Sequence, residues 1–124
     1  MSYNATGEMS FTCSAAVVKY ARVAIDSNQQ VATAGITARG IGIAMNETYA
    51  ANEVCSVRLN TAAGTQECIA SEAIVAGSVV YTAASGQVSD TAAATSYPYG
   101  IALDDASGVN SVIEVLLQIG DTAN

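Results

Sequence analysis

The chain contains no histidine and no tryptophan, and it has only one phenylalanine and one proline. Without histidine there is no Ser-His-Asp or Cys-His pair and no imidazole general base, so the commonest kinds of nucleophilic hydrolase are excluded. The three cysteines, Cys13, Cys55 and Cys68, lack the CxxC spacing of a zinc site as well as a histidine co-ligand. We therefore expect no cofactor and no metal, and we expect the cysteines to be free, buried thiols.

Basic residues are also scarce, and the charge is unevenly placed. Four lysines and arginines stand against eleven acids, which gives a net charge of −7. Residues 1–58 hold four acids and all four bases, whereas residues 59–124 hold seven acids and no base. Nucleic-acid binding needs clustered lysine and arginine, and an anionic membrane would repel the second half, so we expect neither partner. The acidic half either keeps the protein soluble or faces solvent while the neutral half docks on something.

Long hydrophobic segments and large side chains are missing too. No apolar run approaches the 18 residues of a membrane span and no signal peptide opens the chain, so we expect a soluble protein made inside the cell. Hydrophobic residues make up 51% of the chain, but much of this is alanine. Small side chains bury little area each, so we expect subunit association to supply part of the stability.

An internal duplication organises what is present. Val23 corresponds to Val80 at an offset of 57, and after a one-residue insertion residues 42–45 correspond to residues 100–103 at an offset of 58. The two repeats span about 16–59 and 73–117. We expect residues 1–12 to be a flexible arm and residues 13–124 to be a single β domain made of the two repeats. Either one barrel or two lobes is compatible with this pattern.

Each repeat has the pattern of short β-strands rather than helices. Residues 23–25 and 79–81 are β-prone runs that lead into turn formers. A second apolar run, a polar loop (residues 46–53 or 104–111) and a final strand follow in each repeat. The final strand of the second repeat, residues 112–119, is the more uniformly apolar, which predicts that it is the more completely buried. The predicted fold is mainly β, a small β-sandwich or barrel-like domain with little helix.

Few residues suggest chemistry. Asp104 and Asp105 are adjacent, so on a strand they would point to opposite faces, and their place at a strand end favours a turn role over a metal site. Gly42 and Gly100 occupy matching places in the repeats, which indicates a bulge or a close backbone approach. The aromatic cluster around Tyr97 and Tyr99 forms either a tight turn or a subunit contact. These observations predict no enzymatic activity.

The second repeat resembles a known pattern. Residues 73–81 (AIVAGSVVY), 85–90 (SGQVSD), 100–106 (GIALDDA) and 112–117 (VIEVLL) are similar, in order and spacing, to the capsid cement or head decoration proteins of tailed phages. The first repeat is similar to the N-terminal half of that family, so the resemblance runs from about residue 11 to 119. The chain departs from the family in its cysteines and at Cys13-Ser14, where many relatives are rich in alanine and glycine.

This resemblance implies a β-rich virion protein on the outer capsid surface, synthesised in the host cytoplasm. It implies a homotrimer that binds the major capsid protein, bridges its subunits and stabilises the mature head. Candidate capsid or subunit contacts are Tyr3, Met9, Phe11, Tyr97 and Tyr99. The alternative is a ligand- or cell-surface-binding module displayed on the virion through its polar loops. A small hydrolase that uses Asp104 and Asp105 is a third and weaker alternative.

Overall fold

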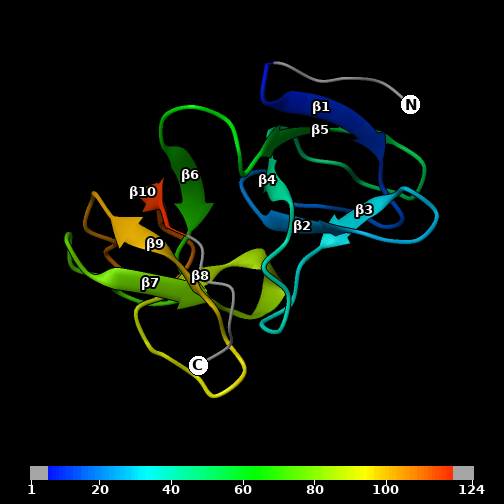
Figure 1. Ribbon diagram of the computed structural model, residues 1–124. Helices are drawn as coiled ribbons and strands as arrows, with labels where there is room; N and C mark the ends of the chain where they lie inside the picture. The colour runs from blue at the N-terminus through cyan, green and yellow to red at the C-terminus, as the bar shows by residue number, and fades with distance from the viewer. Residues whose placement is uncertain (1–5, 119–124) are drawn as a thin grey trace.

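The computed structural model describes residues 6–118 and contains two five-stranded antiparallel sheets (Figure 1). The first sheet has the order β1-β5-β4-β2-β3 and the second has the order β6-β10-β9-β7-β8. The strands of the first sheet are β1 (Glu8–Thr12), β2 (Arg22–Ile25), β3 (Val31–Thr33), β4 (Gly42–Ala44) and β5 (Val54–Leu59). Those of the second are β6 (Gln66–Ile69), β7 (Val79–Thr82), β8 (Val88–Ser89), β9 (Pro98–Ala102) and β10 (Val112–Leu117).

The mainly β prediction is confirmed. Over residues 6–118 the helical structure is a single 3-10 turn, Ala84–Gly86, because the alanine stretches are short and interrupted by glycine, serine and threonine. No helix in this part of the chain is long and apolar enough to span a bilayer. The two sheets lie beside each other, with the first repeat at the blue end of the colour scale and the second at the red end (Figure 1).

The duplication extends through the hydrogen bonds of both repeats. The side-chain amide of Gln30 donates to Asn52 Oδ1 at 3.1 Å, and the amide of Gln87 donates to Asn110 Oδ1 at the same distance. Asn52 and Asn110 both adopt a left-handed backbone, with φ of 71° and 69°, a conformation that asparagine tolerates better than most residues. The offsets of 57 and 58 read from the sequence therefore relate equivalent positions in space.

The repeat is longer than the sequence pattern indicated. Residues 8–12 lie within the segment expected to be an arm, but they form β1, which pairs with β5 from Glu8↔Arg58 to Thr12↔Val54. This strand occupies the same place in the first sheet that β6 occupies in the second. Residues 8–12 are thus an edge strand with half-buried Met9 and Phe11 rather than part of a flexible arm.

Each sheet packs its inner face around its own hydrophobic cluster. The first cluster centres on buried small side chains such as Val23, Ala44 and Val57, and the second on their counterparts Val80, Ala102 and Val115. The expectation of small core residues is therefore correct, and the three cysteines are free and buried as expected. One first-repeat residue, Ile43, belongs to the second cluster, so the two repeats share part of their core.

The matching glycines mark the closest backbone contact in each sheet. A Cβ atom at Gly42 would lie 2.2 Å from the carbonyl oxygen of Arg58, and one at Gly100 would lie 2.3 Å from that of Leu116. Real Cβ atoms do not approach oxygen so closely, so the strand pairs β4–β5 and β9–β10 require glycine there. The predicted close approach is confirmed.

The expectation for the last strand is wrong. Strand β10 alternates between exposed and buried positions, and Val112, Glu114 and Leu116 point outward. Two of its three outward residues are apolar, and within residues 6–118 only the inner face of the strand is buried. The outer face therefore leaves large apolar side chains in contact with solvent.

Candidate functional site

The junction between the repeats is organised by a buried cation. The guanidinium of Arg22, on β2, donates to the carbonyl oxygens of Ala38 at 2.7 Å and Gly35 at 3.1 Å in its own repeat. It also crosses to the second repeat, where it donates to the carbonyl oxygens of Ala83 at 2.6 Å and Gln87 at 3.0 Å. Arg22 is fully buried, and this desolvation lowers its pKa. Carbonyl oxygens from both repeats thus stabilise the Arg22 guanidinium, and these hydrogen bonds join the two repeats.

Tyr99 completes this junction from the second repeat. Its ring centroid lies 5.8 Å from the Arg22 guanidinium, and its hydroxyl donates to Gln66 Oε1 at 3.3 Å. Burial raises the pKa of Tyr99 well above its ordinary value, and burial raises the pKa of the nearby Cys68 thiol to about 12. Because Tyr99 is fully buried, it cannot be the partner contact that the sequence suggested. Its role is to pack the two repeats against each other.

Backbone and hydroxyl contacts extend the junction beyond Arg22. The hydroxyl of Thr82 donates to the carbonyl oxygen of Ile36 at 2.7 Å, and the backbone amide of Gly86 donates to that of Ala34 at 2.8 Å. The β3–β4 loop, residues 34–41, is therefore held by the second repeat.

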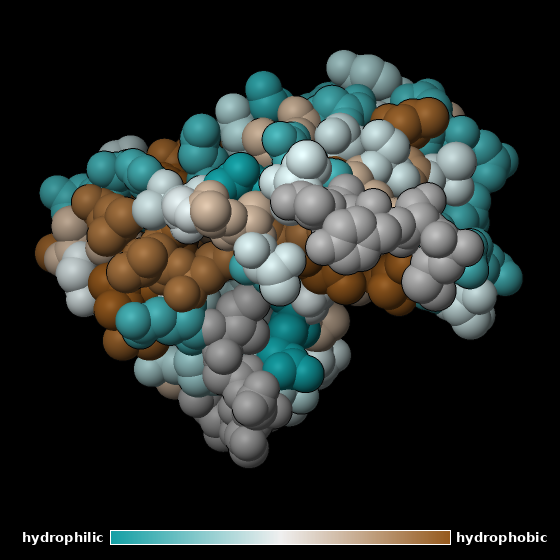
Figure 2. All heavy atoms as spheres, turned by 45° about the horizontal axis from the view of Figure 1, so that its top comes forward, coloured by the Kyte–Doolittle hydropathy of each residue, from teal (hydrophilic) through white to brown (hydrophobic). Residues whose placement is uncertain are grey.

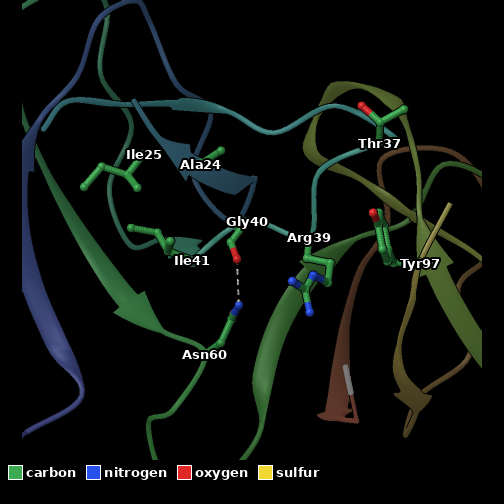
Figure 3. A pocket seen from close by; sticks show the side chains of 8 residues that line it. All are labelled: Ala24, Ile25, Thr37, Arg39, Gly40, Ile41, Asn60 and Tyr97. Carbon is green, nitrogen blue, oxygen red and sulfur yellow. Dashed lines mark hydrogen bonds between the residues drawn. The ribbon is translucent and has the colours of Figure 1, made fainter. Parts of the chain in front are cut away.

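A groove opens beside this loop (Figure 3). It is lined by Ala24, Ile25, Thr37, Arg39, Gly40, Ile41, Asn60 and Tyr97. The apolar side chains Ala24, Ile25 and Ile41 lie together on one side, while Arg39 and Tyr97 lie on the other (Figure 3). The Arg39 guanidinium is 5.5 Å from the Tyr97 ring centroid. Of the predicted contacts, Tyr97 is thus on an accessible surface, and the groove suits a protein segment that presents apolar and acidic groups.

A second surface lies on the outer side of the second sheet. Val79, Ile101 and Leu116 form one row across β7, β9 and β10, since Ile101 pairs with both of the others. Leu103, directly after β9, and Val112, at the start of β10, are also exposed and apolar, and we call these five residues the apolar face. Four of them are 41–46% exposed, and hydrophobic side chains gather over the second repeat on the left of Figure 2. Exposed apolar groups in contiguous rows mark protein interaction sites more often than isolated ones do.

The remaining predicted contacts lie at the opposite side of the first sheet or outside the described residues. Met9 and Phe11 are half-buried on β1, and Phe11 packs partly against the first-repeat cluster. Tyr3 lies outside the described residues. The structure therefore does not bring Met9 and Phe11 together with Tyr97 in one site.

Asp104 and Asp105, the candidate acidic pair, both accept hydrogen bonds from backbone amides. Asp104 Oδ2 accepts a hydrogen bond from the amide of Glu114 at 3.1 Å, and Asp105 Oδ1 accepts one from the amide of Ala76 at 2.7 Å. Both amides belong to distant segments, 10 and 29 residues away, so the two carboxylates fasten this loop to other parts of the chain rather than forming the local turn contacts that the sequence predicted. Within residues 6–118 no group of three or more histidine, cysteine, aspartate or glutamate side chains could hold a metal ion.

Sequence reasoning missed both the apolar face and the apolar side of the groove. The available signal was the sequence of residues 112–117, which is apolar at outward as well as inward positions. This pattern predicts burial within the chain, whereas Val112 and Leu116 are 46% and 41% exposed. Ile25 and Ile41 gave no signal of their own, because each looks like an ordinary strand residue.

Comparison with known proteins agrees with the observed fold. The family model described as phage cement protein matches residues 7–117. A comparison with curated protein sequences found no match. Among solved structures, the N base of the head fibre gp8.5 of bacteriophage phi29 has a TM-score of 0.73 and 17% sequence identity. The similarity covers 90% of this chain and 94% of that one, and at this identity it shows a shared fold.

Proposed function

Since the chain belongs to the phage cement protein family, we propose that it is a head decoration protein that binds the outer surface of the capsid. It is a structural, non-enzymatic component of the phage head. In the proposed role it bridges neighbouring subunits of the major capsid protein and stabilises the mature head. The single observation that carries the proposal is the family match, because it spans nearly all of both repeats rather than one motif.

The described surface suits a bridging role better than a chemical one. Its distinctive features are apolar side chains on two separate surfaces, the groove and the apolar face, while the acidic pair is occupied by backbone amides. A protein that ties subunits together needs several contact surfaces and no reactive group. The acidic second half would keep decorated particles apart by charge repulsion.

We propose that the working unit is a homotrimer. Three modest docking surfaces held in one particle bind together, so the overall attachment is strong even when each contact is weak. The small side chains of both clusters support this, since subunit contacts would add burial that one chain lacks.

The proposed capsid contact is the edge of the first sheet. Strand β1 is an edge strand of that sheet. Met9 and Phe11 project from the same face of this strand. An edge strand can receive a strand or an extended segment from a partner, with the apolar side chains supplying specificity. Together with Tyr3, these residues are the proposed capsid contacts, while Tyr97 belongs to the groove.

The test is cosedimentation of the purified protein with heads of the source phage that lack it. We expect saturable binding at a fixed ratio to the major capsid protein, and release of DNA from decorated heads at a higher temperature than from bare ones. Met9→Ala and Phe11→Ala should weaken binding about tenfold or more, whereas Val109→Ala, an exposed apolar residue far from β1 in sequence, should not. Absence of saturable binding by the folded wild-type protein would rule the proposal out.

The alternative is a recognition module displayed on the virion. It is favoured by one observation, the shared fold with the base of a head fibre. In that case the polar loops, residues 46–53 and 104–111, would contact a ligand or a cell surface. Heads with and without the protein would then release DNA at the same temperature, and only adsorption of the phage to cells would differ.

A further inference from the structure

From the unequal burial of the two repeats, we infer that the apolar face of one chain packs into the groove of a second copy of the same chain, head to tail. This deepens the proposed trimer and rests on that proposal, because it names the two surfaces through which the copies meet. In this arrangement the contact between two chains resembles the contact between the two repeats within one chain.

The first step compares the two outer faces. The offsets of 57 and 58 relate Val79, Ile101 and Leu116 of the apolar face to Arg22, Ile43 and Arg58 of the first repeat. The second set also forms one cross-strand row, since Ile43 pairs with both Arg22 and Arg58.

The two rows differ sharply in exposure. Arg22 and Ile43 are fully buried, because the second repeat covers them. Val79, the counterpart of Arg22, is 46% exposed, and Ile101, the counterpart of Ile43, is half-buried. At the end of the row Leu116 is 41% exposed, whereas its counterpart Arg58 is half-buried. The apolar face is thus equivalent in position to the first-repeat row, but the described residues leave it partly exposed to solvent.

The second step identifies what covers the first repeat. Thr82 and Tyr99 of the second repeat make that contact, through the hydrogen bond to Ile36 and the packing on Arg22. The same offsets relate these two residues to Ile25 and Ile41 of the first repeat. Both isoleucines line the groove, and Ile25 is 44% exposed. The first-repeat surface equivalent to Thr82 and Tyr99 is therefore open and apolar. It can cover the apolar face of another chain as Thr82 and Tyr99 cover the first repeat.

Charge separates this arrangement from a symmetric one. Residues 59–124 carry seven acids and no base, and the exposed Glu114 stands on β10 between Val112 and Leu116. Two apolar faces packed together would bring these acids against each other. The groove belongs mainly to the neutral first repeat and includes Arg39, so it accepts an acidic neighbour without that repulsion.

A head-to-tail contact either closes into a ring or grows into a filament. In a closed ring of three chains, each apolar face would be covered by the groove of the next chain. No apolar face would then remain uncovered, which agrees with the apolar sequence on both sides of β10.

The test measures the mass of the purified full-length chain by light scattering and native mass spectrometry, between about 5 and 200 µM. We expect three chains of 12.5 kDa for the wild type. Leu116→Lys and, independently, Val79→Lys should give folded monomers, as should Ile25→Lys in the groove. Val109→Lys is the matched control, an apolar residue 65% exposed but outside both surfaces, and it should remain a trimer.

Mixing the variants tests the head-to-tail geometry. The Ile25→Lys chain keeps an intact apolar face and the Leu116→Lys chain keeps an intact groove, so an equimolar mixture should form a one-to-one heterodimer. If apolar faces pair symmetrically instead, Ile25→Lys alone would still associate and the inference is wrong. A monomeric wild type, or a trimer unaffected by Leu116→Lys and Val79→Lys, also overturns it.

These results are separable from the proposed function. A wild-type monomer that still binds heads and raises their stability would remove the inference and leave decoration standing. If the wild-type protein is monomeric and the Leu116→Lys variant no longer binds heads, then the capsid, rather than a second copy, covers the apolar face. A trimer that does not bind heads would keep the inference and remove decoration.

Discussion

Replacing Arg22 by methionine should destabilise the protein more than any other single change of similar size. The guanidinium makes four hydrogen bonds to carbonyl oxygens, two from each repeat, at 2.6–3.1 Å. Each such bond contributes about 1 kcal/mol net, so losing all four costs about 4 kcal/mol. Since the site is fully buried, water cannot readily replace the lost donor. For a chain of 124 residues this corresponds to a fall in Tm of roughly 12–20 °C.

The assay is urea unfolding and thermal melting at one fixed protein concentration, so that any self-association contributes equally. Lys19→Met is the control, because Lys19 is exposed, lies outside both the groove and the apolar face, and makes a contact with the Tyr20 ring worth about 0.5–1 kcal/mol. Arg22→Lys should recover only part of the loss, since one ammonium cannot reach four carbonyl oxygens spread around a planar fork. A loss below about 1 kcal/mol for Arg22→Met would refute the view that this cation joins the repeats.

Other parts of the fold give predictions of the same kind. Gly100→Ala should destabilise the protein by about 1–3 kcal/mol or more in urea unfolding, because its Cβ would meet the Leu116 carbonyl oxygen at 2.3 Å, while Gly108→Ala, with nothing within 4 Å, should change little. Stability should fall as the pH rises from about 9 towards 12, because burial raises the pKa of Cys68 from 9.0 to about 12, so its thiol ionises in the unfolded chain but not in the folded one. Burial also raises the pKa of Cys55, which adds to the decline with the same sign. Cys68→Ala should flatten this decline between pH 8.5 and 10.5, and an unchanged slope would contradict the assignment to this thiol.

The surfaces suggest why the two repeats have diverged. At one position of the cross-strand row the first repeat has Arg22 and the second has Val79, although the strands around them are equivalent. An arginine suits a junction inside one chain, where carbonyl oxygens stand ready to receive its hydrogen bonds. In the proposed contact between chains, a valine suits a surface that a second copy covers, since it carries no charge to desolvate on burial.

Several features could be predicted from the sequence because they depend on local chemistry. The strands around Val23 and Val80 follow from β-branched residues bounded by turn formers, and residues 54–59 form the strand that their alternation predicted. The close approach at Gly42 and Gly100 was visible because two glycines stand at equivalent places in a duplication.

Other features could not be read in this way. Residues 8–12 look like a loose terminus until β5 is seen beside them, because strand pairing depends on a partner 46 residues away on average in the observed register. Tyr99 and Tyr97 are neighbours in sequence and equally aromatic, yet one is in the core and the other is in a groove. The bulge between Val80 and Tyr81 and the packing of Arg22 decide that difference, and both involve distant segments.

The sequence alone determined the class of the protein: a mainly β chain with an internal duplication, no catalytic constellation, an excess of acid in its second half, and the pattern of the phage cement protein family. These properties are set by composition, short-range alternation and the order of motifs, all of which are local. The tertiary structure alone decided which of two equivalent faces is covered. Burial depends on which segments pack against each other in space, and among residues 6–118 one face is covered by the other repeat while the equivalent face is left partly exposed.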